Sequence, residues 1–148
     1  MQATITQAQM LAPAAALVVW SLFMLAWMTR ARFAAMAEAG FDLSRSRPGG
    51  RGQDLQGKLP DPVMWKSHNY THLMEQPTLF YAVVVILALV APDRGNALLA
   101  WAYVLLRVVH SVYQATINRV KVRLTIFALA TFVLIALALR ALAATLAG

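Results

Sequence analysis

The fold is decided by residues 70–91, which read YTHLMEQPTLFYAVVVILALVA. The stretch is about as long as the roughly 20 residues with which a helix crosses the hydrocarbon core of a bilayer. It carries one full charge, Glu75, and a charge at the centre of a membrane helix costs roughly 2.5–3.5 kcal/mol or more. Residues kept at such a cost usually act, so the run predicts a membrane span and a functional position within it.

Three further stretches of the chain are long and apolar enough to cross a membrane. The chain of 148 residues is 60% hydrophobic and only 13% charged, whereas a soluble domain is roughly half apolar and a quarter charged. We therefore predict an all-α membrane protein in which the whole chain forms one antiparallel four-helix transmembrane bundle. The spans are expected at residues 10–29, 70–91, 97–117 and 124–147, with a long loop at residues 30–67.

The basic residues lie mostly in two of the connections between spans. A net charge of +7 would suggest a nucleic-acid partner in a soluble protein, but here the charge concentrates in residues 30–67 and 119–123, so no nucleic acid is expected. By the positive-inside rule, these two connections face the cytoplasm and both termini face outside. The first loop is expected to be a solvated basic linker drawn to anionic membrane lipids, or else a partial lid.

Other features of the sequence narrow the chemistry. Residues 1–29 contain no Lys or Arg, so the first span is expected to be retained rather than removed as a signal peptide. The absence of cysteine excludes disulfides, cysteine-ligated metals and a cysteine nucleophile. Pro77 is expected to bend the second span close to Glu75, because proline cannot donate a backbone hydrogen bond.

Polar residues form one stripe on each of two spans. His68, His72 and Glu75 follow an i, i+4, i+7 spacing, which places them on one face of a continuous helix. The third span carries a second stripe with helical spacing, formed by Arg107, His110 and Gln114. With a rise of about 1.5 Å per residue, the two stripes lie at compatible depths, so we expect them to meet.

The stripes alone leave several interpretations open. Glu75 and Arg107 could form a buried ion pair that only fixes the register of the helices. His68, His72, Glu75 and His110 have the donor types of a metal site, although the nearby cation Arg107 disfavours a dication. A lone carboxylate in a span could also serve a small proton-coupled exporter. The basic residues at the helix ends could anchor the protein at the interface or bind an anionic ligand.

The motifs in the second and third spans resemble those of a known family. Residues 75–81 (EQPTLFY), 106–111 (LRVVHS) and 117–120 (INRV), together with Arg123 and the pair Arg30 and Arg32, are similar to the bacterial branch of the membrane-associated proteins in eicosanoid and glutathione metabolism (MAPEG). The resemblance covers all four spans. It implies a homotrimer in a bacterial inner membrane that binds glutathione between protomers as a co-substrate and acts on lipophilic electrophiles or lipid hydroperoxides. Some members of the family only bind lipids.

The resemblance also implies roles for individual residues. Arg123 would favour the glutathione thiolate, with Tyr113 as a second catalytic candidate. Glutathione would be held by Arg30, His68, His72, Glu75, Arg107, His110, Gln114 and Arg119. This chain departs from the enzymatic branch, in which the second span carries Arg-x-x-x-Asn-x-x-Glu and the third a tyrosine. His68, His72 and Gln114 stand at those positions, so a non-catalytic lipid-binding relative is the alternative.

Overall fold

The computed structural model describes residues 5–147. Within them, four helical segments are long and apolar enough to cross a membrane, which confirms the predicted all-α membrane bundle. The helices are α1 (Gln7–Glu38), α2 (Asp61–Leu73), α3 (Gln76–Val90), α4 (Arg94–Thr116) and α5 (Val120–Leu146), with short 3₁₀ helices η1 (Leu43–Arg45) and η2 (Gly52–Leu55) in the first loop.

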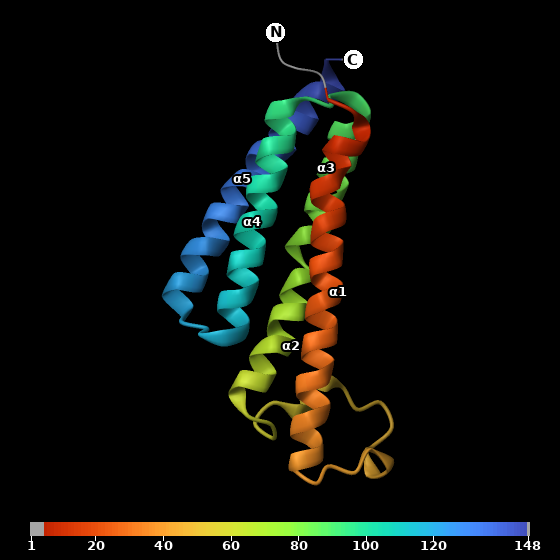
Figure 1. The fold of residues 1–148 in the computed structure, drawn as a ribbon, viewed down its shortest axis with the longest axis vertical. Helices are drawn as coiled ribbons and strands as arrows, with labels where there is room; N and C mark the ends of the chain where they lie inside the picture. Colours follow the sequence, from red (N-terminus) through yellow and green to blue (C-terminus); the bar gives the residue numbers. More distant parts are fainter. Residues whose placement is uncertain (1–4, 148) are drawn as a thin grey trace.

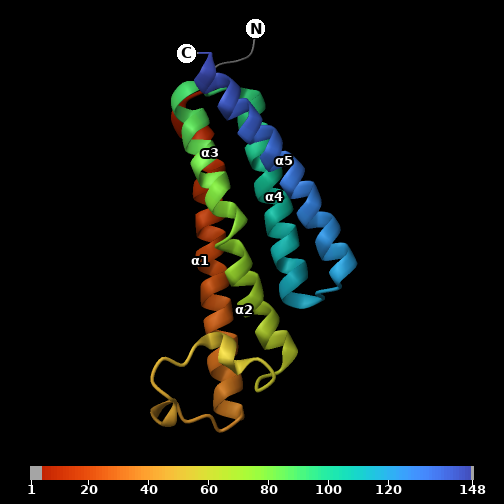
Figure 2. The same ribbon diagram turned by 180° about the vertical axis from the view of Figure 1, so that it is seen from behind.

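The helices run up and down with both termini at the same end (Figure 1). Helix α4 packs against α1, α2 and α5, while α3 packs against α1 and α5. The view from behind shows α2 and α3 as successive parts of one span that follows α1 along its length (Figure 2). Large apolar side chains remain exposed along every span, as expected for a surface that faces lipid rather than water.

The second span is interrupted in the middle, as Pro77 predicts. Helix α2 ends at Leu73 and α3 begins at Gln76, because Pro77 has no N–H to donate to the carbonyl of Leu73. Glu75 lies at the break with φ −89° and ψ −95°. Its carbonyl accepts hydrogen bonds from the backbone N–H and the hydroxyl of Thr78 at 3.2 and 2.6 Å, so the interruption is stabilised locally.

Helix α1 is longer than the expected first span. It continues through residues 30–38, which the sequence placed in the loop, because no proline or glycine interrupts the alanine-rich run before Gly40. Its 32 residues give a length of roughly 48 Å, more than the ~30 Å hydrocarbon core. A small apolar cluster of Ala35, Met36, Leu59 and Met64 packs the end of the loop against this extension.

A polar chain pins the middle of the bundle together. Tyr103 on α4 stacks on Phe80 of α3, with ring centroids 4.3 Å apart, and its hydroxyl donates to Gln76 Oε1 at 3.1 Å. The Gln76 amide in turn donates to the hydroxyl of Thr131 on α5 at 2.9 Å. Three helices are thus joined by side chains whose polar atoms have partners inside an apolar core.

The turn between α3 and α4 is closed by a second polar cluster. Asp93 caps α4 by accepting from the backbone N–H groups of Gly95 and Asn96 at 2.7 and 3.0 Å. The Asn96 amide donates to the carbonyl of Ala91 at 2.9 Å and accepts from Arg140 of α5 at 2.8 Å. The cluster therefore fixes the ends of three helices to one another.

Replacing this cap tests its contribution to stability. Asp93→Ala should lower the free energy of unfolding by about 0.5–2 kcal/mol, because two N–H groups at the start of α4 lose their acceptor. The measurement is thermal unfolding of the detergent-purified protein followed by circular dichroism. Asp93→Asn is the matched control, since it keeps the acceptor oxygen and removes only the charge. Equal losses in both variants would contradict capping as the source.

Candidate functional site

A groove opens beside α2, at the place where the two polar stripes were expected to meet. Its volume is about 250 Å³, and four of the predicted glutathione-binding residues, His68, His72, Glu75 and Gln114, line it. The remaining wall is formed by Gln53, Met64, Ser67 and Thr71. Side chains from α2, from the break at Glu75, from α4 and from the first loop therefore meet in one place.

Arg107 is fully buried and contacts His72, a residue of the groove wall. Its Nη2 donates to the backbone carbonyl of His72 at 2.9 Å and lies 3.3 Å from His72 Nδ1. The ring of Phe127 covers the guanidinium, 5.8 Å from its Cζ, as in a cation–π contact. The two stripes thus meet, as the sequence predicted, and the residues that make the contact are Arg107 and His72.

The contact with Arg107 determines which nitrogen of His72 carries the proton. A guanidinium can only donate, so His72 Nδ1 acts as the acceptor and the N–H of the neutral ring is at Nε2. The ring of His110 lies 5.0 Å from that of His72, and Phe127 packs on both. His72 therefore offers a donor to whatever occupies the groove, while His110 supports it from α4.

Several buried polar atoms at the site have no hydrogen-bond partner. They are Nε and Nη1 of Arg107, Nδ1 of His110, Oε1 of Gln114 and Oδ1 of Asn69. Among residues 5–147, the two ion pairs join Arg45 to Asp42 and Arg47 to Asp54, so the considered pair of Glu75 with Arg107 does not form. Burying a cation with two nitrogens that make no hydrogen bond costs folding free energy. An anionic ligand could accept hydrogen bonds from both nitrogens.

Glu75 occupies a different position from the one that helical spacing predicted. It lies at the break between α2 and α3, so it does not continue the helical face of His68 and His72, although it lines the same groove. The reason is Pro77, which ends the helical hydrogen bonding just before Glu75. The carboxylate is exposed on the surface of the single chain, at a depth where lipid would surround it.

Four other predicted residues, Arg123, Tyr113, Arg30 and Arg119, are not part of the groove wall. Arg123, partly buried near the start of α5, donates to the side-chain carbonyl of Asn118 at 2.7 Å. Asn118 has φ +56°, a left-handed conformation that asparagine tolerates, and it ends α4. Tyr113 is partly buried, whereas Arg30 and Arg119 are exposed. The single chain brings none of these four predicted residues into the groove wall.

Comparison with protein families matches the MAPEG family over residues 10–143, nearly the whole chain. The chain belongs to the MAPEG family. Its resemblance to that family in the span motifs is thereby confirmed. The comparisons with curated proteins and with solved structures found no significant match to the chain. Membership supports an integral membrane protein of the glutathione and eicosanoid metabolism type.

The structure of this MAPEG protein adds residues that the sequence did not single out. Oε1 of Gln56 accepts from His68 Nε2 at 2.9 Å, and Gln53 lines the groove, so the loop contributes to the site. Ser111 accepts from both Asn69 of α2 and Trp20 of α1, at 2.7 and 3.0 Å. Asn69 and Ser111 lie close in sequence to His72 and His110. Their side chains are uncharged, however, and the sequence alone did not indicate that they bond to each other.

The residues weighed as metal ligands do not form a cluster in the single chain. Among residues 5–147, no three His, Cys, Asp or Glu side chains lie close enough together to hold a metal ion. His68 is exposed and engaged with Gln56, and Nδ1 of His72 is engaged by Arg107.

The bonds to Ser111 predict a measurable coupling. Ser111→Ala leaves the buried donors of Asn69 and Trp20 without an acceptor, which should cost about 1–3 kcal/mol in the free energy of unfolding. The loss should be smaller in a Trp20→Phe background, where one of the donors is already gone. A thermal-unfolding cycle of the two single variants and the double variant measures this coupling. Strict additivity would contradict the hydrogen-bonded triad.

Proposed function

We propose that this protein is a membrane glutathione transferase or peroxidase that binds glutathione in the groove and acts on lipophilic electrophiles or lipid hydroperoxides. The observation that carries the proposal is the buried guanidinium of Arg107, which has two unpartnered nitrogens next to a groove lined by Glu75 and His72. Glutathione has two carboxylates for such cations, an ammonium for a carboxylate and peptide groups for neutral donors.

Each proposed contact matches the chemistry of one part of glutathione. Glu75 accepts the ammonium of the γ-glutamyl group, while Arg107, Arg30 and Arg119 bind carboxylates. The side chains of His68, His72, His110 and Gln114 hold the peptide backbone, and His72 does so through the Nε2 proton that its contact with Arg107 implies. This division uses charged groups for the charged ends and neutral donors for the middle of the tripeptide.

Arg123 is the proposed catalytic residue. A free thiol has a pKa of about 8.5, so a cation beside it increases the fraction of reactive thiolate at neutral pH. The thiolate then attacks the electrophilic carbon, the carbon–sulfur bond forms, and the leaving group departs with its electron pair. Asn118 holds the Arg123 guanidinium at 2.7 Å and so limits the positions that it can adopt. Tyr113, which makes no such contact, is the weaker candidate.

Assembly with further copies would complete the site. Glu75, Arg30 and Arg119 are exposed on one chain, and a lone carboxylate facing lipid is unfavourable. A homotrimer would cover Glu75 with a neighbouring protomer and bring cations of that protomer to the groove. We propose that the protein lies in a bacterial inner membrane with the first loop on the cytoplasmic side, and that lipophilic substrates reach the groove laterally from the lipid.

Glutathione binding tests the proposed contacts directly. Glu75→Gln should weaken binding of glutathione to the detergent-purified protein by about 10- to 100-fold, as expected for the loss of a charge-assisted hydrogen bond worth about 1.5–3 kcal/mol. Arg107→Ala should have an effect of similar size. The measurement is isothermal titration calorimetry with glutathione as the titrant.

The matched control is Glu38→Gln, which removes the same charge from an exposed position at the end of α1. Its affinity for glutathione should equal that of the wild type. Circular dichroism of each variant shows whether the helices are retained, which matters most for the buried Arg107. Unchanged affinity in a folded Glu75→Gln variant would remove Glu75 from the binding site and leave the proposal without its carboxylate.

The pH dependence of turnover tests the role of Arg123. Without the cation, the pKa of the bound thiol should rise toward its free value, so Arg123→Gln should lose most activity at pH 6.5 and recover much of it at pH 9. The measurement is kcat/KM for conjugation of glutathione to 1-chloro-2,4-dinitrobenzene. Lys121→Gln, in the first turn of the same helix α5, should leave the profile unchanged. A loss in Arg123→Gln that is equal at all pH values would contradict thiolate stabilisation. Binding without any turnover in the wild type would favour the non-catalytic alternative.

A further inference from the structure

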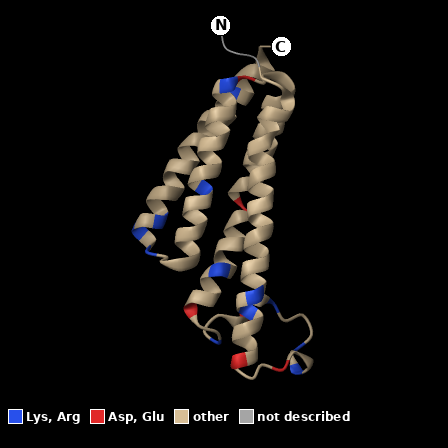
Figure 3. Ribbon diagram, viewed as in Figure 1, with Lys and Arg blue, Asp and Glu red and all other residues tan. Residues whose placement is uncertain are grey.

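A second cavity lies apart from the groove, between the end of α1 and the first loop. Its volume is about 710 Å³, and residues 32–58 supply its walls. Basic residues gather at this end of the molecule (Figure 3), and the cavity is lined by five cations and two carboxylates: Arg32, Arg45, Arg47, Arg51, Lys58, Asp42 and Asp54.

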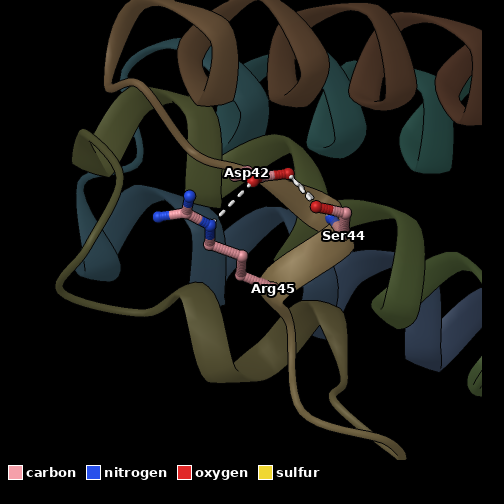
Figure 4. Close-up of polar contacts among 3 residues, drawn as sticks. All are labelled: Asp42, Ser44 and Arg45. Atoms are coloured by element: carbon pink, nitrogen blue, oxygen red, sulfur yellow. Dashed lines mark hydrogen bonds and ion pairs between the residues drawn. The ribbon is translucent and has the colours of Figure 1, made fainter.

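Both carboxylates are engaged by neighbouring residues. Asp42 pairs with Arg45 at 3.2 Å and also accepts from the hydroxyl and the backbone N–H of Ser44 (Figure 4). These bonds from Ser44 lower the pKa of Asp42. Asp54 pairs with Arg47 at 3.1 Å, and the backbone N–H of Arg51, together with Arg47, lowers the pKa of Asp54. The two acids therefore stay ionised and neutralise Arg45 and Arg47.

Three cations of the cavity are left without a carboxylate. Within residues 5–147, Arg32, Arg51 and Lys58 form no ion pair. Arg32 is also held in place, because its Nη2 donates to the Ser67 hydroxyl. Its Nε is buried and has no hydrogen-bond partner. Gly52 packs so closely on this guanidinium that a Cβ there would lie 2.6 Å from Arg32 Nη1. The wall thus presents one cation held by its neighbours and two exposed cations, Arg51 and Lys58.

The same cavity is also lined by apolar side chains. Phe33, Phe41 and Leu43 also line it, and they are 55%, 36% and 57% exposed. Phe33 follows the end of the expected hydrocarbon span by about one helical turn, which places it near the lipid headgroups. The cavity is therefore amphipathic, because it combines three cations that form no ion pair within residues 5–147 with exposed apolar side chains.

We infer that this cavity binds a phosphate ester with an apolar organic part. A phosphate group can accept hydrogen bonds from Arg32, Arg51 and Lys58 together, and guanidinium groups bind phosphate oxygens in pairs. The apolar side chains cover the organic part of the ligand. An anionic phospholipid of the adjoining leaflet and a soluble phosphate monoester share this chemistry.

Lipid retention in detergent tests the inference. The full-length protein in a nonionic detergent is mixed with dioleoylphosphatidylglycerol or dioleoylphosphatidylcholine, and native mass spectrometry measures the lipid retained. The anionic lipid should be retained more strongly. Arg51→Gln and Lys58→Gln should each reduce its retention by about fivefold, the loss expected for one cation near a lipid headgroup. Both residues are exposed, so both variants should fold.

Lys121→Gln is the matched control, because it removes one exposed cation from the start of α5, outside the cavity lining. Its retention of phosphatidylglycerol should equal that of the wild type. An equal loss in Lys121→Gln, or full retention in Arg51→Gln and Lys58→Gln, would overturn the inference in favour of general charge attraction. Absence of any preference for phosphatidylglycerol over phosphatidylcholine would overturn it as well.

A competition experiment separates the two sources of the phosphate. Phenyl phosphate is added to the complex with phosphatidylglycerol, and lipid release is measured. Release supports the cavity as a site for soluble phosphate monoesters, while retention supports it as a lipid site. The experiment contains no glutathione, and it leaves Glu75 and Arg107 unchanged. Its failure is therefore distinguishable from a failure of the proposed function.

Discussion

The buried guanidinium of Arg107 is the constraint on which the rest of the structure depends. A charge in an apolar bundle needs polar neighbours, and the structure supplies the carbonyl and ring of His72 and the face of Phe127. These contacts draw α2, α4 and α5 together around one point. The other polar clusters of the bundle, around Gln76 and around Asn96, have partners for their side chains, whereas Arg107 keeps two nitrogens without one.

Two cavities with different chemistry lie toward the same end of the bundle. The groove combines a carboxylate, neutral donors and a buried cation, which suits a small zwitterionic peptide. The loop cavity combines unpaired cations with exposed aromatic rings, which suits an amphipathic anion. The first loop contributes to both, since Gln53 lines the groove and Arg51 and Lys58 line the loop cavity. It is therefore a structured part of the protein.

The spans could be predicted from the sequence because hydrophobic length is a strong and local signal. That the two polar stripes meet also followed from helical spacing and depth, but the contact is made by Arg107 with His72 rather than with Glu75. The position of Glu75 did not follow, because spacing arguments assume a continuous helix and Pro77 breaks it. The contacts of Gln56 and Ser111 depend on side-chain packing between distant segments, and a single sequence carries no sign of such packing. The extension of α1 was missed because basic residues were taken to mark the loop.

The interruption at Met74 and Glu75 has a structural consequence. It divides the second span into two rods with different neighbours, since α2 packs on α1 and α4 while α3 packs on α1 and α5. The position of α2, and with it the width of the groove, is therefore set by α1 and α4 rather than by α3. The first loop is fixed to the same helix, because Gln56 is bonded to His68. The broken span thus lets one stretch of chain serve two different packing surfaces.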